Sequence, residues 1–142
     1  MSVFSEYQTD TIDLALDFYG YEDCPKNYEF GPSVRDNFVL HFVTKGKGVF
    51  HFNKKEIHLE AGDLFLLPKN KVTYYKADAE EPWSYYWIGI SGTKVSDFMR
   101  FSTLHAKGFL KKTEVETEKI GQFMERLVHK AEASKMTSHY QL

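Results

Sequence analysis

Alternating apolar and polar residues dominate the first two thirds of the chain and predict β-strands. Near the start, every second residue is apolar, which is the period of a half-buried strand: Ile12, Leu14, Leu16 and Phe18. Residues 20–32 contain two glycines and two prolines, so we predict a loop with one short extended piece. Residues 37–44, NFVLHFVT, predict a second strand that ends at the turn-forming residues 45–48.

Residues 49–59 predict a hairpin whose register the sequence leaves open. A loop at residues 54–55 places His51 opposite His58, whereas a loop at residues 53–54 places His51 opposite Glu56. These registers differ by two residues, so one face carries the same apolar side chains in both: Phe50, Phe52, Ile57 and Leu59. Two imidazoles without a third ligand make a poor metal site, so we interpret the histidine face as solvated.

Residues 62–77, GDLFLLPKNKVTYYKA, combine a tight turn, a buried strand and a polar end. Gly62 accepts a positive φ, and the Asp63 side chain can bond the following backbone amides. The apolar run Leu64–Leu67 predicts a strand buried on both faces, and Pro68 closes it. The spacing of the motif resembles the second conserved motif of the cupins, which are small double-stranded β-barrels. Metal-binding cupins carry a His ligand where this chain has Thr73.

Residues 83–90, WSYYWIGI, predict a further strand with two distinct faces. Trp83, Tyr85 and Trp87 share one face, and the residues between them share the other. The period then changes, because Val95, Phe98 and Met99 recur at helical spacing. Candidate caps for this helix are Ser91 and Thr93. Residues 109–110 predict a small extended piece.

A second helix is indicated after Thr113, which is spaced with Glu116 as a capping box. Its apolar stripe consists of Ile120, Phe123, Met124, Leu127, Val128 and Ala131. The stripe either packs on the strands of the same chain or meets its copy in a second chain, and the sequence leaves both open. Dimerisation would use Ile120, Phe123, Met124, Leu127 and Val128.

The order of the elements predicts a mainly β fold of the α+β type. Strands come first and helices afterwards, so we predict a cupin-like double-stranded β-barrel, or jelly roll, followed by C-terminal helices. The barrel is assigned to residues 1–92, with residues 1–11 as an N-terminal arm, and the helical dimerisation segment to residues 93–142. The chain stops without a C-cap, so we expect it to be cut from a longer protein.

Composition narrows the function classes. A chain of 142 residues is about one domain and needs no disulfide to fold, and its single Cys24 cannot form an internal one. The net charge is −2 with mixed signs, so the basic stripe of a nucleic-acid surface is absent from the sequence. We find no signal peptide and no apolar run of ~18 residues, which predicts a soluble, cytoplasmic protein without membrane contact.

The positions where cupins usually bind metal carry other residues here. Counting back from Gly46 places the Glu position of the first cupin motif at Val39 and its His pair at residues 32–35, which contain neither His nor Glu. With Thr73 in the second motif, all the expected ligands are missing, so we predict no metal and no cofactor. No catalytic motif is present, and we interpret Cys24 as an ordinary thiol. No catalytic residue is therefore assigned.

A pocket with aromatic walls is the remaining candidate site. Sugars are held by stacking their C–H faces on aromatic rings while a few polar groups fix their orientation. The aromatic candidates are Tyr75, Tyr85 and Trp87, and the polar partners are Arg35 and His41. Each also has a purely structural interpretation, as a core aromatic residue or as a satisfied core histidine.

Two long segments carry a resemblance to a known family. They read FGPSVRDNFVLHFVTKGKGVFHF and LEAGDLFLLPKNKVTYYKADAEEPWSYYWIGISG, and they are similar to the N-terminal effector-binding and dimerisation half of AraC-type transcriptional regulators. The resemblance covers residues 25–92 closely and the following helices more loosely. It implies a small effector, often a sugar, with ligand contacts at Tyr75, Tyr85 and Trp87.

The same resemblance implies the partners of the chain. The helices would pair two chains as a homodimer, and DNA would be bound only through a C-terminal helix-turn-helix domain that this chain lacks. Many relatives have His at the positions of Thr73 and Tyr85, so the effector can differ. The alternatives are a cupin enzyme acting on a sugar or small metabolite, and a purely structural dimerisation module.

Overall fold

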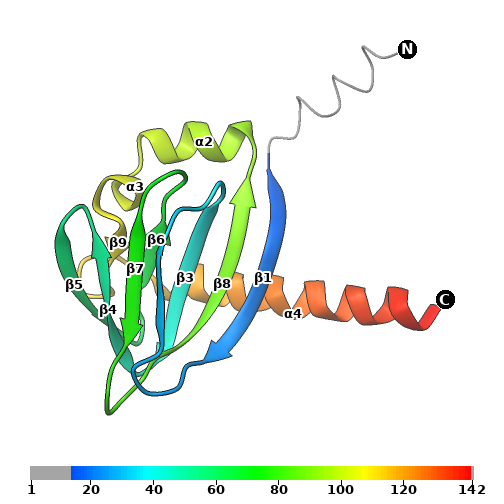
Figure 1. The fold of residues 1–142 in the computed structure, drawn as a ribbon. Coiled ribbons are helices and arrows are strands. Elements are labelled where there is room, and N and C mark those ends of the chain that lie inside the picture. Colours follow the sequence, from blue (N-terminus) through cyan, green and yellow to red (C-terminus); the bar gives the residue numbers. More distant parts are fainter. Residues whose placement is uncertain (1–13, 142) are drawn as a thin grey trace.

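Two antiparallel β-sheets face each other, and helices cover the outer side of one of them (Figure 1). The computed structural model describes residues 14–141, with side chains described through residue 135. The predicted N-terminal arm, residues 1–11, lies outside the described residues. No helix in the part of the chain that the structure describes is long and apolar enough to cross a membrane.

The strand pairing is that of a jelly roll. One sheet has the order β1 (Ala15–Asp23), β8 (Ser84–Ser91), β3 (Phe38–Lys45), β6 (Leu64–Leu67) and β9 (Phe109–Leu110). The other has the order β2 (Glu29–Ser33), β7 (Thr73–Ala77), β4 (Lys47–Phe52) and β5 (Lys55–Glu60). Strand β1 pairs with β8, β2 with β7, β3 with β6, and β4 with β5. This nested pairing defines a double-sheet jelly roll, so the predicted fold class is confirmed.

The β4–β5 hairpin settles the open register. Asn53 and Lys54 form the loop with positive φ values of 52° and 63°, and His51 pairs with Glu56. The apolar face predicted for the hairpin is confirmed, because Phe50, Phe52, Ile57 and Leu59 are all buried.

The start of the chain differs from the prediction. Strand β1 continues to Asp23 and β2 covers residues 29–33, so most of the predicted loop is strand. A bulge between Leu16 and Phe18 breaks the simple alternation, which leaves Leu14 66% exposed and turns Phe18 toward the core. Strict alternation from residue 12 was therefore the wrong pattern for this edge strand.

Three helices follow or flank the last strands: α2 (Thr93–Arg100), α3 (Thr103–Lys107) and α4 (Glu118–Gln141). Neither predicted cap of α2 is used, because the N-cap is Gly92 and has no side-chain hydrogen bond. Helix α3 was not predicted. Ser102 caps it by accepting a hydrogen bond from the His105 amide, and Gly108 ends it with a φ of 87°.

The capping box predicted for the last helix is wrong. Thr113 lies in a turn, Glu116 lies in the irregular stretch before the helix, and α4 begins at Glu118. Thr117, the residue just before the helix, is buried, and its hydroxyl donates a hydrogen bond to the carbonyl of Gly62, which is far away in the sequence. A tertiary contact, rather than a local box, thus fixes where the chain enters α4.

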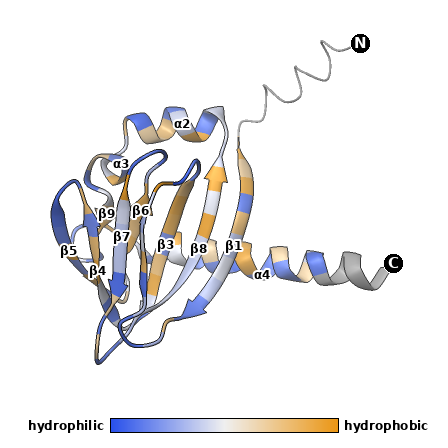
Figure 2. Cartoon of the chain, viewed as in Figure 1, coloured by the Kyte–Doolittle hydropathy of each residue, from blue (hydrophilic) through white to orange (hydrophobic). Residues whose placement is uncertain are grey.

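The core has two parts, one on each side of the β1–β8–β3–β6 sheet. Between the sheets lies a largely aromatic cluster that includes Phe50, Phe65 and Trp83. On the outer side, Ile88 and Leu66 pack under the helices with Met124 and other apolar residues. Figure 2 shows hydrophobic residues along β1, β8 and β3, whereas β5 is mostly hydrophilic. The predicted division of β8 into two faces is confirmed, since its alternate residues enter the two clusters.

Candidate functional site

A cavity of about 220 Å³ lies between the two sheets. All five residues predicted to bind a ligand line it: Arg35, His41, Tyr75, Tyr85 and Trp87. Val39 and Leu67 add aliphatic wall. The structure therefore brings together side chains from β3, β7, β8 and the segment before β3.

Strand alternation and a glycine place the aromatic wall. Tyr85 and Trp87 are two residues apart on β8, so both point into the barrel. Tyr75 reaches them from the other sheet, and its hydroxyl lies 3.1 Å from that of Tyr85. Opposite Trp87 on β1 is Gly20, where an added Cβ would lie 2.3 Å from the indole ring. Only glycine leaves room for the indole in this position.

His41 is the polar group at the inner wall of the cavity. It is 2% exposed and stacks on Phe65 with ring centroids 4.2 Å apart. Its Nδ1 atom has no hydrogen-bond partner among the residues that the structure describes. Burial lowers the pKa of His41 to about 3, so the imidazole is neutral at pH 7 and offers both a donor and an acceptor.

Arg35 is positioned by aromatic rings. Its guanidinium carbon lies 4.9 Å from the centroid of Phe18 and 5.8 Å from that of Phe30. These cation–π contacts hold the planar guanidinium against the wall of the cavity. Glu22 lines the same cavity, so its wall contains both a basic and an acidic residue.

Besides the aliphatic Val39 and Leu67, four lining residues were not among the predicted site residues: Phe18, Glu22, Tyr28 and Phe30. Three of them lie in residues 20–32, which were predicted to be mostly loop, and loops give no signal about which side chains face inward. On β1, the two-residue spacing of Phe18, Gly20 and Glu22 is the pattern that points to Phe18 and Glu22.

Tyr75, Tyr85 and the nearby Cys24 stay protonated at neutral pH. Burial raises the pKa of Tyr75 and of Tyr85, so both remain neutral hydroxyls. Burial also raises the pKa of the Cys24 thiol to about 11, which fits the interpretation of an ordinary thiol rather than a nucleophile. These groups can donate and accept hydrogen bonds, but none is poised as a base.

The donor groups do not converge on a metal position. Among the described residues, no three His, Cys, Asp or Glu side chains are arranged to hold a metal ion. Val39, at the position counted for a carboxylate ligand, presents an aliphatic side chain to the cavity. The hydroxyl of Thr73 is buried without a partner in the described part of the chain and does not line this cavity.

Residues 15–141 match the family described as the AraC-like ligand binding domain. The chain belongs to this family. The AraC-like match includes every strand of the jelly roll and all three helices, and thus the whole wall of the cavity.

Three relatives of this AraC-like domain are named as regulators of operons. The Msm operon regulatory protein of Streptococcus mutans is 45% identical over 73% of this chain and 37% of that protein. The raffinose operon transcriptional regulatory protein RafR of Pediococcus pentosaceus is 40% identical over 68% of this chain and 36% of RafR. The lactose operon transcription activator of Staphylococcus xylosus is 34% identical over 68% of this chain and 35% of that protein. The matched region is thus little more than a third of each relative.

Among solved structures, the cupin domain of Schizosaccharomyces pombe Cnp3 is similar to the AraC-like domain. The TM-score is 0.49, with 16% identity over 63% of each chain.

The stripe of α4 divides between two environments. Met124 and Val128 are fully buried against the outer side of the β1–β8–β3–β6 sheet, which is the packing alternative left open by the sequence. Phe123 is 55% exposed, and Ile120 is also exposed, while Leu127 is half-buried. Ile120 and Phe123 line an outer groove of about 930 Å³ that runs between α4 and the α2–α3 segment.

Proposed function

We propose that this chain is the effector-binding part of an AraC-type transcriptional regulator, and that it binds a small neutral sugar in the cavity between its sheets. The observation that carries the proposal is the cavity itself, where an aromatic wall, a cation, a carboxylate and an unsatisfied neutral imidazole meet. The names of two relatives, which regulate raffinose and lactose operons, support a sugar as the effector. The proposed function is regulation and not catalysis.

The walls suit a single sugar ring. Trp87 and Tyr75 offer flat faces for C–H groups, while Arg35, Glu22 and His41 offer donors and acceptors for hydroxyls. A volume of about 220 Å³ is below the ~300–1,000 Å³ of sites for drug-sized ligands. One ring of an oligosaccharide would therefore occupy the cavity, and any further ring would extend outward.

The remaining parts of the regulator are assigned in the same proposal. Residues 1–92 form the effector-binding part and residues 93–142 the helical part, which pairs two chains through exposed residues of α4 such as Ile120 and Phe123. Met124 and Val128 are left out of that interface because they are buried within the chain. DNA binding belongs to a separate domain outside this chain, and the regulator works in the cytoplasm.

Thermal denaturation with a sugar panel tests the proposal. Galactose, glucose, lactose and raffinose are added to wild type, to Trp87→Leu and to Tyr74→Phe, which alters a tyrosine on the outer face of β7. At about 100 times the dissociation constant, a bound sugar raises the Tm of wild type and Tyr74→Phe by about 5–10 °C. Trp87→Leu loses that shift.

Two results would count against it. The binding function is rejected if no sugar of a broad panel shifts the Tm and none changes tryptophan fluorescence. Chemical conversion of a bound sugar, detected by NMR of the recovered sugar, would instead favour a cupin enzyme.

A further inference from the structure

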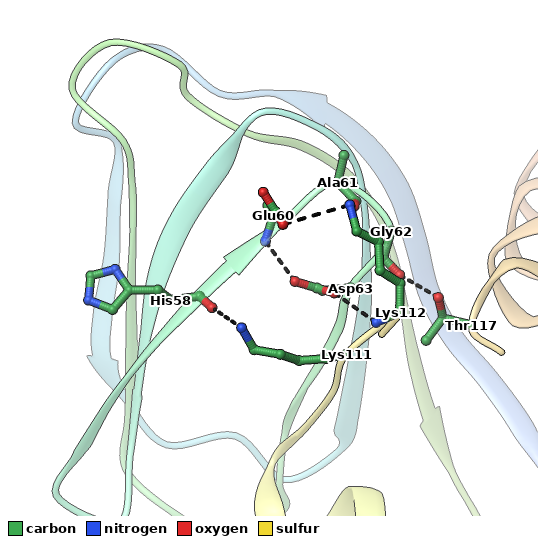
Figure 3. Close-up of polar contacts among 8 residues, drawn as sticks. All are labelled: His58, Glu60, Ala61, Gly62, Asp63, Lys111, Lys112 and Thr117. Carbon is green, nitrogen blue, oxygen red and sulfur yellow. Dashed lines mark hydrogen bonds and ion pairs between the residues drawn. The ribbon is translucent and has the colours of Figure 1, made fainter. Parts of the chain in front are cut away.

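A polar cluster ties the barrel to the segment that leads into α4. Figure 3 shows the turn between β5 and β6 facing residues 111–117, with hydrogen bonds running between the two segments. We use the name "latch" for four of these residues: Gly62, Asp63, Lys112 and Thr117. Further along α4, the ring of His129 lies within hydrogen-bond distance of the Tyr86 hydroxyl on β8, at 3.2 Å.

Asp63 is the centre of the latch. It is 2% exposed, and its two oxygens accept hydrogen bonds from two backbone amides, that of Glu60 at 2.8 Å and that of Lys112 at 2.9 Å. Hydrogen bonds to a buried carboxylate are among the stronger ones in proteins. Asp63 therefore bonds back to Glu60 and across to a distant segment, and not to the following amides as the sequence predicted.

The other latch residues close the same junction. Thr117, the residue before α4, donates to the carbonyl of Gly62, and the ammonium of Lys112 donates to the carbonyl of Ala61 at 2.8 Å. Gly62 has a φ of 98°, and the stem of Lys112 lies over it so closely that an added Cβ would be 2.7 Å from Lys112 Cδ. The turn and the entry to α4 are thus packed as one unit.

The latch is also bonded directly to a wall strand of the cavity. The Val43 amide donates to the carbonyl of Asp63 at 3.0 Å, and the Gly62 amide donates to the carbonyl of Val43 at 2.8 Å. His41 lines the cavity, and Val43 is the next residue on β3 that points to the same side of the sheet. On β6, two residues after Asp63, Phe65 stacks on that same imidazole.

Beyond the latch, α4 lies on the outer face of the same sheet. Gly121 sits against the ring of Phe42, where an added Cβ would approach to 2.3 Å, and Met124 is fully buried one turn later. The neighbour of Phe42 on β3 is His41, which points to the opposite side of the sheet and into the cavity. Displacement of β3 or β6 by a ligand would act on the helix entry through hydrogen bonds that resist stretching.

We propose that the latch couples the cavity to α4, so that occupancy of the cavity changes how firmly the first turns of the helix are held on the barrel. Asp63 is a positioning residue in this coupling, because it touches no ligand and acts through the backbone of Lys112 and Val43. The inference rests on the proposed effector binding for its biological meaning. Its structural half, that cavity strands and α4 share one latch, is tested without any sugar.

Hydrogen exchange measured by mass spectrometry on the whole chain provides the test. Asp63→Asn keeps the shape but turns an amide group toward two N–H donors, so one of the two bonds is lost. Without sugar, we expect exchange to rise by about tenfold or more both in residues 118–124 and in residues 38–43. Met124→Ala, which loosens α4 but leaves the latch intact, raises exchange more in residues 118–124 than in residues 38–43.

The same variants are then compared with and without raffinose, lactose and galactose. In wild type, a bound sugar slows exchange in residues 38–43 and changes it in residues 112–121. In Asp63→Asn, residues 38–43 still respond and residues 112–121 do not. Glu116→Gln removes only the exposed pair with Lys119 in the same segment and behaves as wild type. Thr117→Val provides a second latch variant if Asp63→Asn does not fold.

The outcomes separate the two proposals. If Asp63→Asn leaves residues 38–43 at the wild-type rate without sugar, or if residues 112–121 respond to sugar equally in both proteins, the latch does not couple these sites. If no sugar slows exchange in residues 38–43 of wild type, the sugar-binding proposal fails for these sugars, and the sugar-free comparison still decides on the latch.

Discussion

His41 on β3 and Asp63 in the turn before β6 are both 2% exposed. They differ in how their side chains are hydrogen-bonded. Both oxygens of Asp63 are bonded to backbone amides. The Nδ1 atom of His41 has no partner among the described residues, and the residue lines a cavity. A buried polar group with its partners in place stabilises the fold, whereas one with an open partner position costs stability.

The largest expected effect comes from removing the satisfied group. Asp63→Ala leaves two buried amides without acceptors, so we expect the free energy of unfolding to fall by about 3–4 kcal/mol in urea denaturation. His41→Leu, the matched change on the open side, should alter it by less than about 1 kcal/mol, since an unsatisfied imidazole is replaced by an apolar group. Equal losses for both variants would show that the two sites do not differ as described.

Next in size is the contrast along α4. Met124→Ala removes a fully buried side chain and should cost about 3 kcal/mol. Phe123→Ala, one residue earlier and 55% exposed, should cost less than about 1 kcal/mol in a dilute monomer. If Phe123→Ala costs as much as Met124→Ala and the loss depends on protein concentration, then Phe123 is buried by a second chain.

The neutral state of His41 makes stability depend on pH. The unfolded imidazole takes up a proton below about pH 6.5, whereas buried His41 stays neutral down to about pH 3, so the fold loses stability as pH falls through this window. Between pH 7 and pH 5, wild type should lose about 2 kcal/mol more than His41→Leu. Parallel pH profiles for the two proteins in urea denaturation would contradict a buried, neutral imidazole.

The smallest effect is expected at the hydroxyl pair of the cavity. Tyr85→Phe removes one hydroxyl and leaves that of Tyr75, 3.1 Å away, without this partner. We expect a loss of about 1 kcal/mol in the free energy of unfolding, measured in urea. Tyr74→Phe, whose hydroxyl bonds Glu29 on the exposed surface, is the control and should change stability by less than about 0.5 kcal/mol. If Tyr74→Phe lowered the free energy of unfolding more than Tyr85→Phe does, burial would not determine the size of these losses.

Local periodicity was sufficient for the parts of the fold that repeat every two residues. The alternation of β8 separated Trp87 from Ile88 correctly, and the buried run Leu64–Leu67 is a strand. Four of the five predicted ligand-binding residues, His41, Tyr75, Tyr85 and Trp87, lie on strands, where parity decides which side chains point inward. Arg35 lies outside the strands and reaches the same cavity over the rings of Phe18 and Phe30.

The remaining features depend on contacts that a single sequence does not display. The bulge after Leu16, and the prediction of residues 20–32 as a loop with only one short extended piece, hid Glu22 and Phe30 from the predicted site. Thr117 replaces the predicted capping box because its partner is the carbonyl of Gly62. The buried face of the β4–β5 hairpin was predicted correctly because it is the same in both possible registers. The partner of His51 was left open, because both loops fit the same hydrophobic pattern, and the structure pairs it with Glu56.

The most direct test of sugar binding in the cavity uses the two tryptophans of the chain. Trp87 lines the cavity, whereas Trp83 is completely buried in the neighbouring core and does not line it. In ¹⁵N-labelled protein titrated with galactose, lactose or raffinose, the indole signal of Trp87, assigned with Trp87→Phe, should shift saturably while that of Trp83 moves little. Saturable shifts confined to residues of the outer groove, or no shift of the Trp87 indole with any of these sugars, would contradict the account.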